Sequence, residues 1–327
     1  MQKTPIHNLF YNSSYLEKKV RICGWVRTLR SQKTFSFLQI NDGSSVESLQ
    51  VVIEDTFPNY SSLIKELSTG ASVQVTGLVV RSQGKRQTVE MQPENIEIIG
   101  PCPEDYPLQK KRHSFAYLRS ISHLRPRTNT QGACLRMRSM ISFAVHQFFQ
   151  QEGFFHIHTP IITTLDCEGA GEMFRITKDG KDFFGLPAYL TVSGQLEAEI
   201  CALALSNVYT FGPTFRAENS NTSRHLAEFW MIEPEMAFCE LAENMEMAEK
   251  FLRYILTYAL EKGGKDLAFF SQFIEEGLTE KLEGFLKEPF AKLSYTEAIE
   301  ILQKAPAKFI YPPKWGHDLQ SEHERYL

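Results

Sequence analysis

Arginine, glutamate and aromatic side chains recur at alternating positions on both sides of a polar segment in residues 209–236. The polar segment is rich in Asn, Ser and Thr, which favour turns. Alternate residues of an extended strand point to the same side, so the pattern predicts an antiparallel hairpin with an apolar underside and a polar upper face. The residues expected on the upper face or in its loop are Arg216, Glu218, Arg224, His225, Phe229 and Glu233.

These side chains suit the chemistry of a nucleotide. A guanidinium group binds phosphate through two parallel hydrogen bonds, and an exposed phenylalanine ring can stack on a base. Carboxylates can hold an amine or the amino edge of a purine. On spacing alone, a solvated hairpin with ordinary surface charges explains the pattern equally well, because charged residues normally face solvent.

Three strings in this hairpin resemble the second signature motif of the class II aminoacyl-tRNA synthetases: Phe-Arg-Ala-Glu at 215–218, Arg-His at 224–225 and Glu-Phe at 228–229. Residues 211–235 as a whole are similar to the asparaginyl enzymes of bacterial type, in the aspartyl, asparaginyl and lysyl subgroup. The resemblance implies an α+β catalytic domain, an antiparallel sheet with flanking helices. It also implies a ligase that uses ATP and Mg²⁺ to activate asparagine and then transfers it to tRNA(Asn).

The same resemblance assigns roles in ATP binding. It implies that Arg216 holds the α-phosphate, that Phe229 stacks on adenine, and that Glu218 lies near the amino edge of that base. Arg224 or His225 would reach the outer phosphates or the acceptor end of the tRNA. Arg216 and Glu218 are therefore the expected catalytic residues, and catalysis would consist of orientation and charge stabilisation without a side-chain nucleophile. For Mg²⁺ the sequence offers no complete ligand set.

A glycine-containing loop precedes the hairpin. Gly169 and Gly171 allow unusual backbone angles, so this segment reads as a plain turn or as a mobile loop. The resemblance identifies it as the loop that closes over the amino acid, with Glu168 near the substrate's α-amino group.

The next segment is a predicted helix with Ser193 as its cap. Gln195 and Glu199 are four residues apart and so share one face, as they would on any amphipathic helix. The resemblance implies that Ser193, Gln195 and Glu233 line the amino-acid pocket. Aspartyl enzymes carry a lysine at the position of Ala198, whereas a carboxylate at Glu199 accepts from an amide and repels aspartate. We therefore expect asparagine as the substrate.

Short alternating strands fill residues 1–100 and predict an all-β barrel of the OB type. Three strands, a short helix and further strands follow that order, and such barrels bind single-stranded nucleic acid through aromatic and basic residues. The expected strands lie near 20–26, 35–40, 49–53, 73–79, 89–91 and 96–99, with a helix at 60–67.

The barrel also carries candidate contacts to RNA. Phe37 alone reads more readily as a core residue, because aromatic side chains are mostly buried. The segment resembles the anticodon-binding domain of the subgroup, which implies that Phe37 stacks on an anticodon base and that Gln50 and Glu90 read base edges. Arg27 completes the expected anticodon-binding set.

Residues 101–126 are a predicted linker, because prolines and a basic run interrupt any regular element. The basic run is either a solvated hinge or a strip for tRNA phosphates. The catalytic domain is expected at 127–327, with a helical insertion at about 240–310 whose predicted helices are 240–262, 267–286 and 293–302. A helix followed by Gly and Pro at 137–160 resembles the first class II motif, which implies a homodimer through that segment.

The composition of the chain restricts its possible partners and cellular compartment. The net charge of −4 provides no overall basic field, so any RNA contact must be local. Six scattered cysteines without a C-x-x-C pair favour a reducing compartment. There is no apolar run of membrane-spanning length and no signal-peptide pattern, so we expect a cytoplasmic protein without a membrane partner.

The family's third motif and its metal-binding acidic residues have no counterpart before Leu327. We therefore expect an incomplete catalytic domain, and little or no tRNA charging by this chain alone. The alternatives are an aspartyl or dual-specificity synthetase, a non-catalytic tRNA-binding fragment, and an amide-forming enzyme on the same fold; the N-terminal barrel counts against the last.

Overall fold

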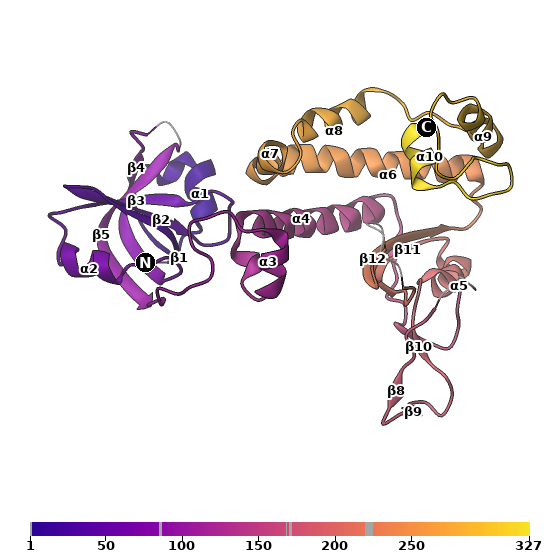
Figure 1. Ribbon diagram of the computed structural model, residues 1–327, viewed down its shortest axis with the longest axis horizontal. Coiled ribbons are helices and arrows are strands. Elements are labelled where there is room, and N and C mark those ends of the chain that lie inside the picture. The colour runs from indigo at the N-terminus through magenta and orange to yellow at the C-terminus, as the bar shows by residue number, and fades with distance from the viewer. Residues whose placement is uncertain (1, 85–86, 168, 170–171, 220–224) are drawn as a thin grey trace. The chain divides into compact units, whose positions relative to one another are not determined.

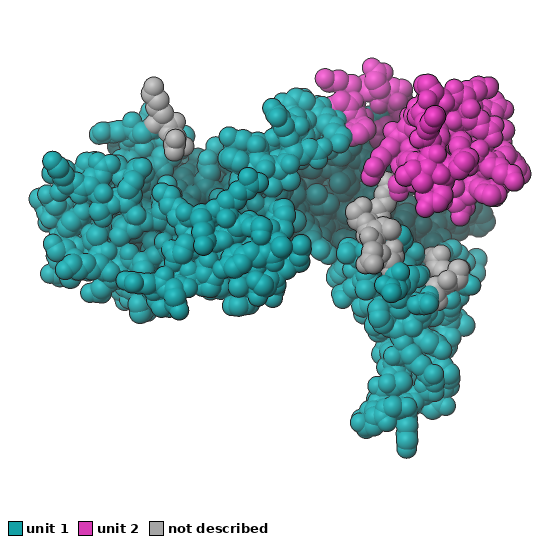
Figure 2. Space-filling view, in the orientation of Figure 1, with its two compact units in different colours: residues 1–283 teal, residues 284–327 magenta. Residues whose placement is uncertain are grey.

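The structure is a computed structural model that describes residues 2–84, 87–167, 169, 172–219 and 225–327 (Figure 1). It contains two compact units, residues 1–283 and 284–327 (Figure 2). The N-terminal barrel and the hairpin both belong to the first unit.

A closed five-stranded barrel with strand order β1-β2-β3-β5-β4 begins the chain. Its alternating apolar residues point inward, and Ile22, Leu38 and Val75 are fully buried. Strand period two therefore separates a core from a polar outer surface, and the predicted OB barrel is confirmed. The elements are α1 (Ile6–Tyr11), a 3-10 turn (Ser13–Tyr15), β1 (Lys19–Ser31), β2 (Phe35–Asn41), β3 (Leu49–Glu54), α2 (Tyr60–Glu66), β4 (Ser72–Arg81) and β5 (Val89–Gly100).

Strand β5 corrects the prediction of two short strands at 89–91 and 96–99. The structure has one continuous strand that passes through Pro93. Pro93 lies opposite Gly77 of β4, and the register between the two strands shifts at this point. A bulge tolerates a proline because the irregular ladder does not require a hydrogen bond from its nitrogen.

The predicted hairpin is present as two strands of a three-stranded sheet with order β12-β11-β6. Phe148 and Phe149 of helix α4 form a buried cluster with Tyr209 of β11. Helix α4 therefore covers the underside of the hairpin, and α6 packs against α4 (Figure 1). The elements are α3 (Phe115–Ser120), a 3-10 turn (Arg125–Arg127), α4 (Asn129–Gln151), β6 (Phe155–His156), α5 (Gln195–Leu205), β11 (Asn207–Phe215), β12 (Glu228–Met236) and α6 (Leu241–Lys262).

Short strand pairs and further helices complete the chain. The prediction of one helix over 267–286 is wrong, because the chain turns at Gly277, whose φ is +75°, and divides the segment in two. No helix in the described part of the chain is long and apolar enough to span a membrane. The remaining elements are β7 (Ile162–Thr163) paired with β10 (Tyr189–Leu190), β8 (Thr177–Lys178) paired with β9 (Lys181–Asp182), α7 (Gly264–Phe273), α8 (Leu278–Lys287), α9 (Tyr295–Gln303) and α10 (Ser321–Tyr326).

Candidate functional site

The upper face of the hairpin brings together the side chains that the alternating pattern predicts. Strands β11 and β12 pair Thr210 with Glu233 and Thr214 with Phe229. These four residues share one side of the pleat, opposite to Tyr209, because side chains alternate along each strand. The face is therefore built by register, and its underside is fixed by the apolar cluster against α4.

Arg216 lies one residue beyond β11 and is placed over an aromatic ring. Its backbone N–H donates to the carbonyl of Ala227 at 3.1 Å, which extends the pairing of the hairpin. Its guanidinium carbon is 5.6 Å from the centroid of the Phe229 ring, within the range of a cation–π contact. The structure thus places the Arg216 guanidinium beside the Phe229 ring.

Two of the other predicted ATP-binding residues lie at the exposed ends of the hairpin loop, and one is not described. Glu218 and His225 are exposed near the ends of the loop that joins the two strands. Arg224, together with Glu168 of the glycine loop, lies outside the described residues. The backbone N–H of Ala217 donates to the carbonyl of Glu172 at 2.8 Å, which attaches the end of the glycine loop to the hairpin.

Glu233 is the most constrained carboxylate of this face. It accepts hydrogen bonds from the Ser193 hydroxyl, from the Gly194 backbone N–H at 3.2 Å and from the Thr210 hydroxyl at 2.8 Å. A carboxylate held by several donors has a fixed orientation. It can therefore bind a substrate ammonium group without rearrangement.

Ser193 does not occupy the predicted cap position of α5. The cap position of α5 is Gly194, which has no capping side chain, while the Ser193 hydroxyl bonds to Glu233 and also accepts from the Gln195 N–H at 3.1 Å. Gly194 fits tightly, because an added Cβ would lie 2.7 Å from Thr159 Oγ1. The helix thus begins one residue later than a Ser193 cap requires, and the Ser193 hydroxyl donates to Glu233.

Two further carboxylates lie close to Glu233. Gln195 Nε2 donates to Glu199 Oε1 at 2.9 Å, which confirms that these residues share one face of α5. Burial raises the pKa of Glu235, and the nearby charges of Glu199 and Glu233 raise it further. Glu199, Glu233 and Glu235 therefore form an acidic cluster, which is suited to an ammonium or amide group.

Sequence reasoning missed three members of this pocket. Thr210 and Gly194 bind Glu233 from β11 and the start of α5, and Glu235 adds its charge. Period two from Glu233 identifies Glu235 as a neighbour on the same face. The two long-range donors leave no comparable signal in the sequence.

No group of three or more His, Cys, Asp or Glu side chains in the described residues is arranged to hold a metal ion. At Glu233, three hydrogen bonds from protein donors already reach the two carboxylate oxygens.

A second set of predicted residues lies on the outer surface of the barrel. Phe37 is half-buried, outside the core, with the Arg30 guanidinium carbon 5.0 Å from its ring centroid. Gln50 Nε2 donates to Glu90 Oε2 at 3.3 Å, and Ser82 Oγ donates to the same oxygen at 2.8 Å. The reading of Phe37 as a core residue is wrong, because in β2 it is the alternate residues Ser36 and Leu38 that point inward.

Arg27 lies apart from this set. It occupies a bulge in β1, where the register with β2 shifts between Val26 and Thr28. Bulges redirect side chains, and Arg27 reaches the Arg127 carbonyl oxygen and, at 2.6 Å, Asn129 Oδ1. The structure does not bring it together with Phe37.

Comparisons with known proteins identify the family of the chain. Residues 116–327 match the family model "tRNA synthetases class II (D, K and N)", and residues 20–99 match "OB-fold nucleic acid binding domain". The chain is 55% identical to an asparagine–tRNA ligase of Microcystis aeruginosa, covering 95% of this chain and 70% of that protein. It is 57% identical to one of Protochlamydia amoebophila, covering 94% of this chain and 69% of that protein.

Among solved structures, the asparaginyl-tRNA synthetase of Pyrococcus horikoshii complexed with asparaginyl-adenylate superposes with a TM-score of 0.85. That comparison covers 100% of this chain and 71% of the other, at 28% sequence identity. The chain therefore belongs to the class II tRNA synthetases of the aspartyl, lysyl and asparaginyl group.

Proposed function

We propose that this protein is an asparagine–tRNA ligase, which activates asparagine with ATP and joins it to tRNA(Asn). The observation that carries the choice of asparagine is the hydrogen bond from Gln195 to Glu199. It fixes one carboxylate oxygen and leaves the other able to accept from a side-chain amide. An aspartate carboxylate in that place would meet like charge.

Ala198 supports the same choice. It occupies the position at which aspartyl enzymes carry a lysine, and it is fully buried against Ala202 and Val208. An apolar contact at this position cannot supply the cation that would neutralise an aspartate side chain.

The reaction has two steps. A carboxylate oxygen of asparagine attacks the α-phosphorus of ATP, the bond to the bridging oxygen breaks, and pyrophosphate leaves. A hydroxyl of the terminal ribose of the tRNA then attacks the activated carbonyl carbon, and AMP leaves. The first step leaves asparaginyl-adenylate as the intermediate. Both steps need alignment and charge stabilisation, which the hairpin supplies without a covalent bond between enzyme and substrate.

We assign the roles as follows. Arg216 binds the α-phosphate and stabilises the charge that develops on it, and Phe229 stacks on adenine. Glu233 binds the ammonium group of asparagine, together with Ser193 and Gln195. The roles of Glu168, Glu218, Arg224 and His225 follow from the family motif alone. Mg²⁺ would accompany ATP, since the described residues offer no cage of their own.

On the barrel, Phe37, Gln50 and Glu90 would bind the anticodon. An aromatic ring beside an arginine on an open surface suits stacking on an unpaired base. The hydrogen-bonded pair of Gln50 and Glu90 offers polar groups for base edges. Arg27 belongs to the expected set, although its hydrogen bonds point to the start of α4.

We also propose a domain organisation for the chain. Residues 1–100 would form the anticodon-binding domain, 101–126 the hinge and 127–327 the catalytic domain, with the helical insertion at about 240–310. A homodimer through 137–160 would cover Phe143 and Phe155, which are 61% and 54% exposed. We place the reaction in the cytoplasm, where tRNA is charged.

Calorimetric titration with a non-hydrolysable sulfamoyl analogue of asparaginyl-adenylate tests this function. The protein should bind the asparaginyl analogue about 100-fold or more tightly than the aspartyl analogue, because Glu199 can accept from the amide and repels an aspartate carboxylate. Equal affinity, or a preference for the aspartyl analogue, would refute the assignment of asparagine.

A further inference from the structure

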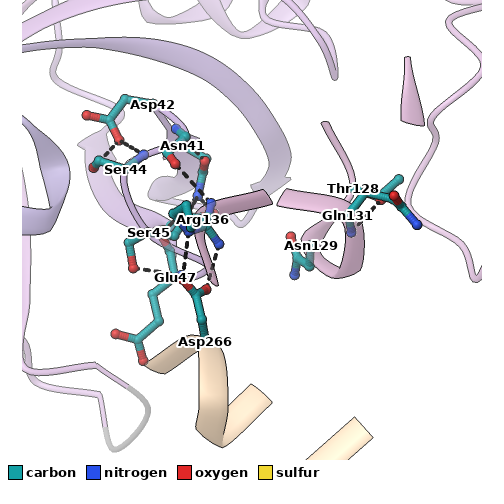
Figure 3. Close-up of polar contacts among 12 residues, drawn as sticks. Asn41, Asp42, Ser44, Ser45, Glu47, Thr128, Asn129, Gln131, Arg136 and Asp266 are labelled. Atoms are coloured by element: carbon teal, nitrogen blue, oxygen red, sulfur yellow. Dashed lines mark hydrogen bonds and ion pairs between the residues drawn. The ribbon is translucent and has the colours of Figure 1, made fainter. Parts of the chain in front are cut away.

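Arg136 connects three separate parts of the first unit. Its Nε donates to Asp266 Oδ2 at 2.8 Å and its Nη2 donates to Asp266 Oδ1 at 2.7 Å. The remaining terminal nitrogen, Nη1, donates to the carbonyl oxygen of Gly43 at 2.9 Å. One guanidinium on α4 therefore holds the first turn of α7 and the turn that follows β2 of the barrel (Figure 3).

The barrel turn is rigid before Arg136 reaches it. Asn41 Oδ1 accepts from the Gly43 N–H at 2.8 Å, and Asn41 Nδ2 donates to two carbonyls further along, those of Ser45 and Glu47. Asp42 accepts from the backbone of Ser44. Gly43 has a φ of +85°, which favours glycine. Its carbonyl is thus presented in one direction, as an acceptor for a fixed donor.

The chain around Arg136 leaves room for this geometry. A Cβ added at Gly132, one helical turn earlier, would lie 3.3 Å from Arg136 Nη1. The side chains of Arg136 and Asp266 are only 24% and 16% exposed. A bidentate, partly buried pair is stronger and more directional than a surface ion pair.

The contact is reciprocal. Arg27, on the barrel, reaches the Arg127 carbonyl and Asn129 at the start of α4, while Arg136, on α4, reaches the barrel. Lys265 Nζ adds a contact to Glu47 Oε1 at 3.1 Å. One arginine reaches from the barrel to α4, and the other reaches from α4 to the barrel. Two such contacts restrain both the rotation of the barrel about α4 and its separation from α4, whereas one contact restrains only the separation.

Helix α4 carries this restraint to the hairpin. It is continuous from Asn129 to Gln151, and about 18 Å of helix separates Arg136 from Phe148, at 1.5 Å per residue. Phe148 lies in the buried cluster beneath the hairpin. At the other end, β2 carries Phe37 and leads directly into the turn that Arg136 holds.

We propose that Arg136 is a positioning residue that sets the placement of the anticodon surface relative to the adenylate hairpin. It contributes to the binding of an intact tRNA, which must meet both sites at once, and not to either site alone. The inference rests on the proposed function and adds to it. Linked sites bind a rigid ligand tightly only when their spacing matches.

The test compares Arg136→Met with the wild-type chain in three binding measurements. The ligands are intact tRNA(Asn), an isolated stem-loop with the anticodon GUU, and the asparaginyl sulfamoyl analogue. The affinity for intact tRNA should fall about tenfold, because the second contact loses effective concentration. The affinities for the stem-loop and the analogue should stay within about twofold.

Small-angle scattering of the free protein provides a readout that does not depend on RNA. The distance distribution of Arg136→Met should broaden and its radius of gyration should rise. Arg136→Lys keeps the charge but not the planar fork, so it should show smaller changes of the same kind. If Arg136→Met fails to fold, the same measurements on Arg136→Lys test whether Arg136 positions the barrel.

Arg253→Met is the matched control, since Arg253 forms an ion pair with Glu249 within α6. It should leave all four measurements unchanged. Unaltered tRNA affinity in Arg136→Met, or an equal loss of stem-loop affinity, would overturn the proposal. Failure of the proposed function would appear differently, as absent binding of stem-loop and analogue by the wild type, and scattering would still decide whether Arg136 fixes the barrel.

Discussion

Thr210 and Glu233 are direct partners in the register of β11 and β12, and the Thr210 hydroxyl donates to Glu233 Oε2 at 2.8 Å. Thr210 is almost fully buried. Together with Ser193 and Gly194 it holds the carboxylate from a second strand and from the start of α5. The orientation of Glu233 is thus set by packing before any substrate arrives, which is the arrangement that electrostatic catalysis requires.

Replacing Thr210 with valine should weaken binding of the asparaginyl sulfamoyl analogue by roughly tenfold. Valine keeps the shape but removes a hydrogen bond to a charged group, worth about 1.5 kcal/mol. Calorimetric titration measures the change. Thr214→Val is the matched control, because that hydroxyl donates to the Phe229 carbonyl at 3.2 Å and not to Glu233. An equal loss in both variants would show that Thr210 has no specific effect on the carboxylate.

Phe229→Leu should lower the affinity for adenosine-containing ligands. Loss of base stacking costs about 1–3 kcal/mol, which corresponds to a decrease of roughly tenfold to a hundredfold. The affinity for ATP, measured by displacement of a fluorescent nucleotide, reports it. Trp230→Leu changes the next residue, which faces the opposite side and packs with Phe211, and should have little effect. ATP binding that survives Phe229→Leu would exclude the stacking role.

The sequence predicted features that depend on local pattern. Strand alternation predicted the barrel and the hairpin because burial on one face enforces period two. The same reasoning failed at Pro93, where a breaker of regular strands is accommodated by a register shift opposite Gly77. It failed again at Gly277, because helical spacing in the sequence does not record a single residue of positive φ.

In the site, local sequence pattern predicted fewer of the contacts than it did in the fold. Capping preference correctly marked Ser193 as a residue near the start of a helix. It could not indicate that the same hydroxyl donates to Glu233, 40 residues later. Local pattern also could not show that Arg27 lies apart from Phe37. Its partners near α4 are about 100 residues away, and a bulge redirects its side chain. Contacts between distant segments decide which polar residues serve a site, and local pattern does not encode them.

Gly77→Ala should destabilise the barrel by about 1–3 kcal/mol, because overpacking forces the backbone to move. An added Cβ would lie 2.2 Å from the Gln92 carbonyl oxygen. Hydrogen exchange of barrel amides, followed by mass spectrometry, measures the loss. Gly212→Ala is the control, since no atom lies within 4 Å of its added Cβ. Equal protection of the barrel in Gly77→Ala and wild type would contradict the predicted clash.

Glu235 should titrate above the ordinary range of a glutamate. Burial raises its pKa, and the negative charges of Glu199 and Glu233 raise it further. The folded state therefore binds this proton more strongly than the unfolded state does. The contribution of Glu235 to stability is fully present below the unfolded pKa of about 4.3, and it is lost as the pH rises through the higher folded pKa.

Carbon-13 NMR of labelled glutamate side chains tests this directly, with the Glu235 signal assigned by its absence in Glu235→Gln. Glu199→Gln removes one neighbouring charge and should move the Glu235 titration to lower pH. The thermal midpoint of Glu235→Gln, relative to wild type, should rise with increasing pH, because this variant no longer ionises a buried carboxyl. Glu246→Gln, exposed on α6, should leave both quantities unchanged. A Glu235 titration that does not respond to Glu199→Gln would show that the two carboxylates do not interact.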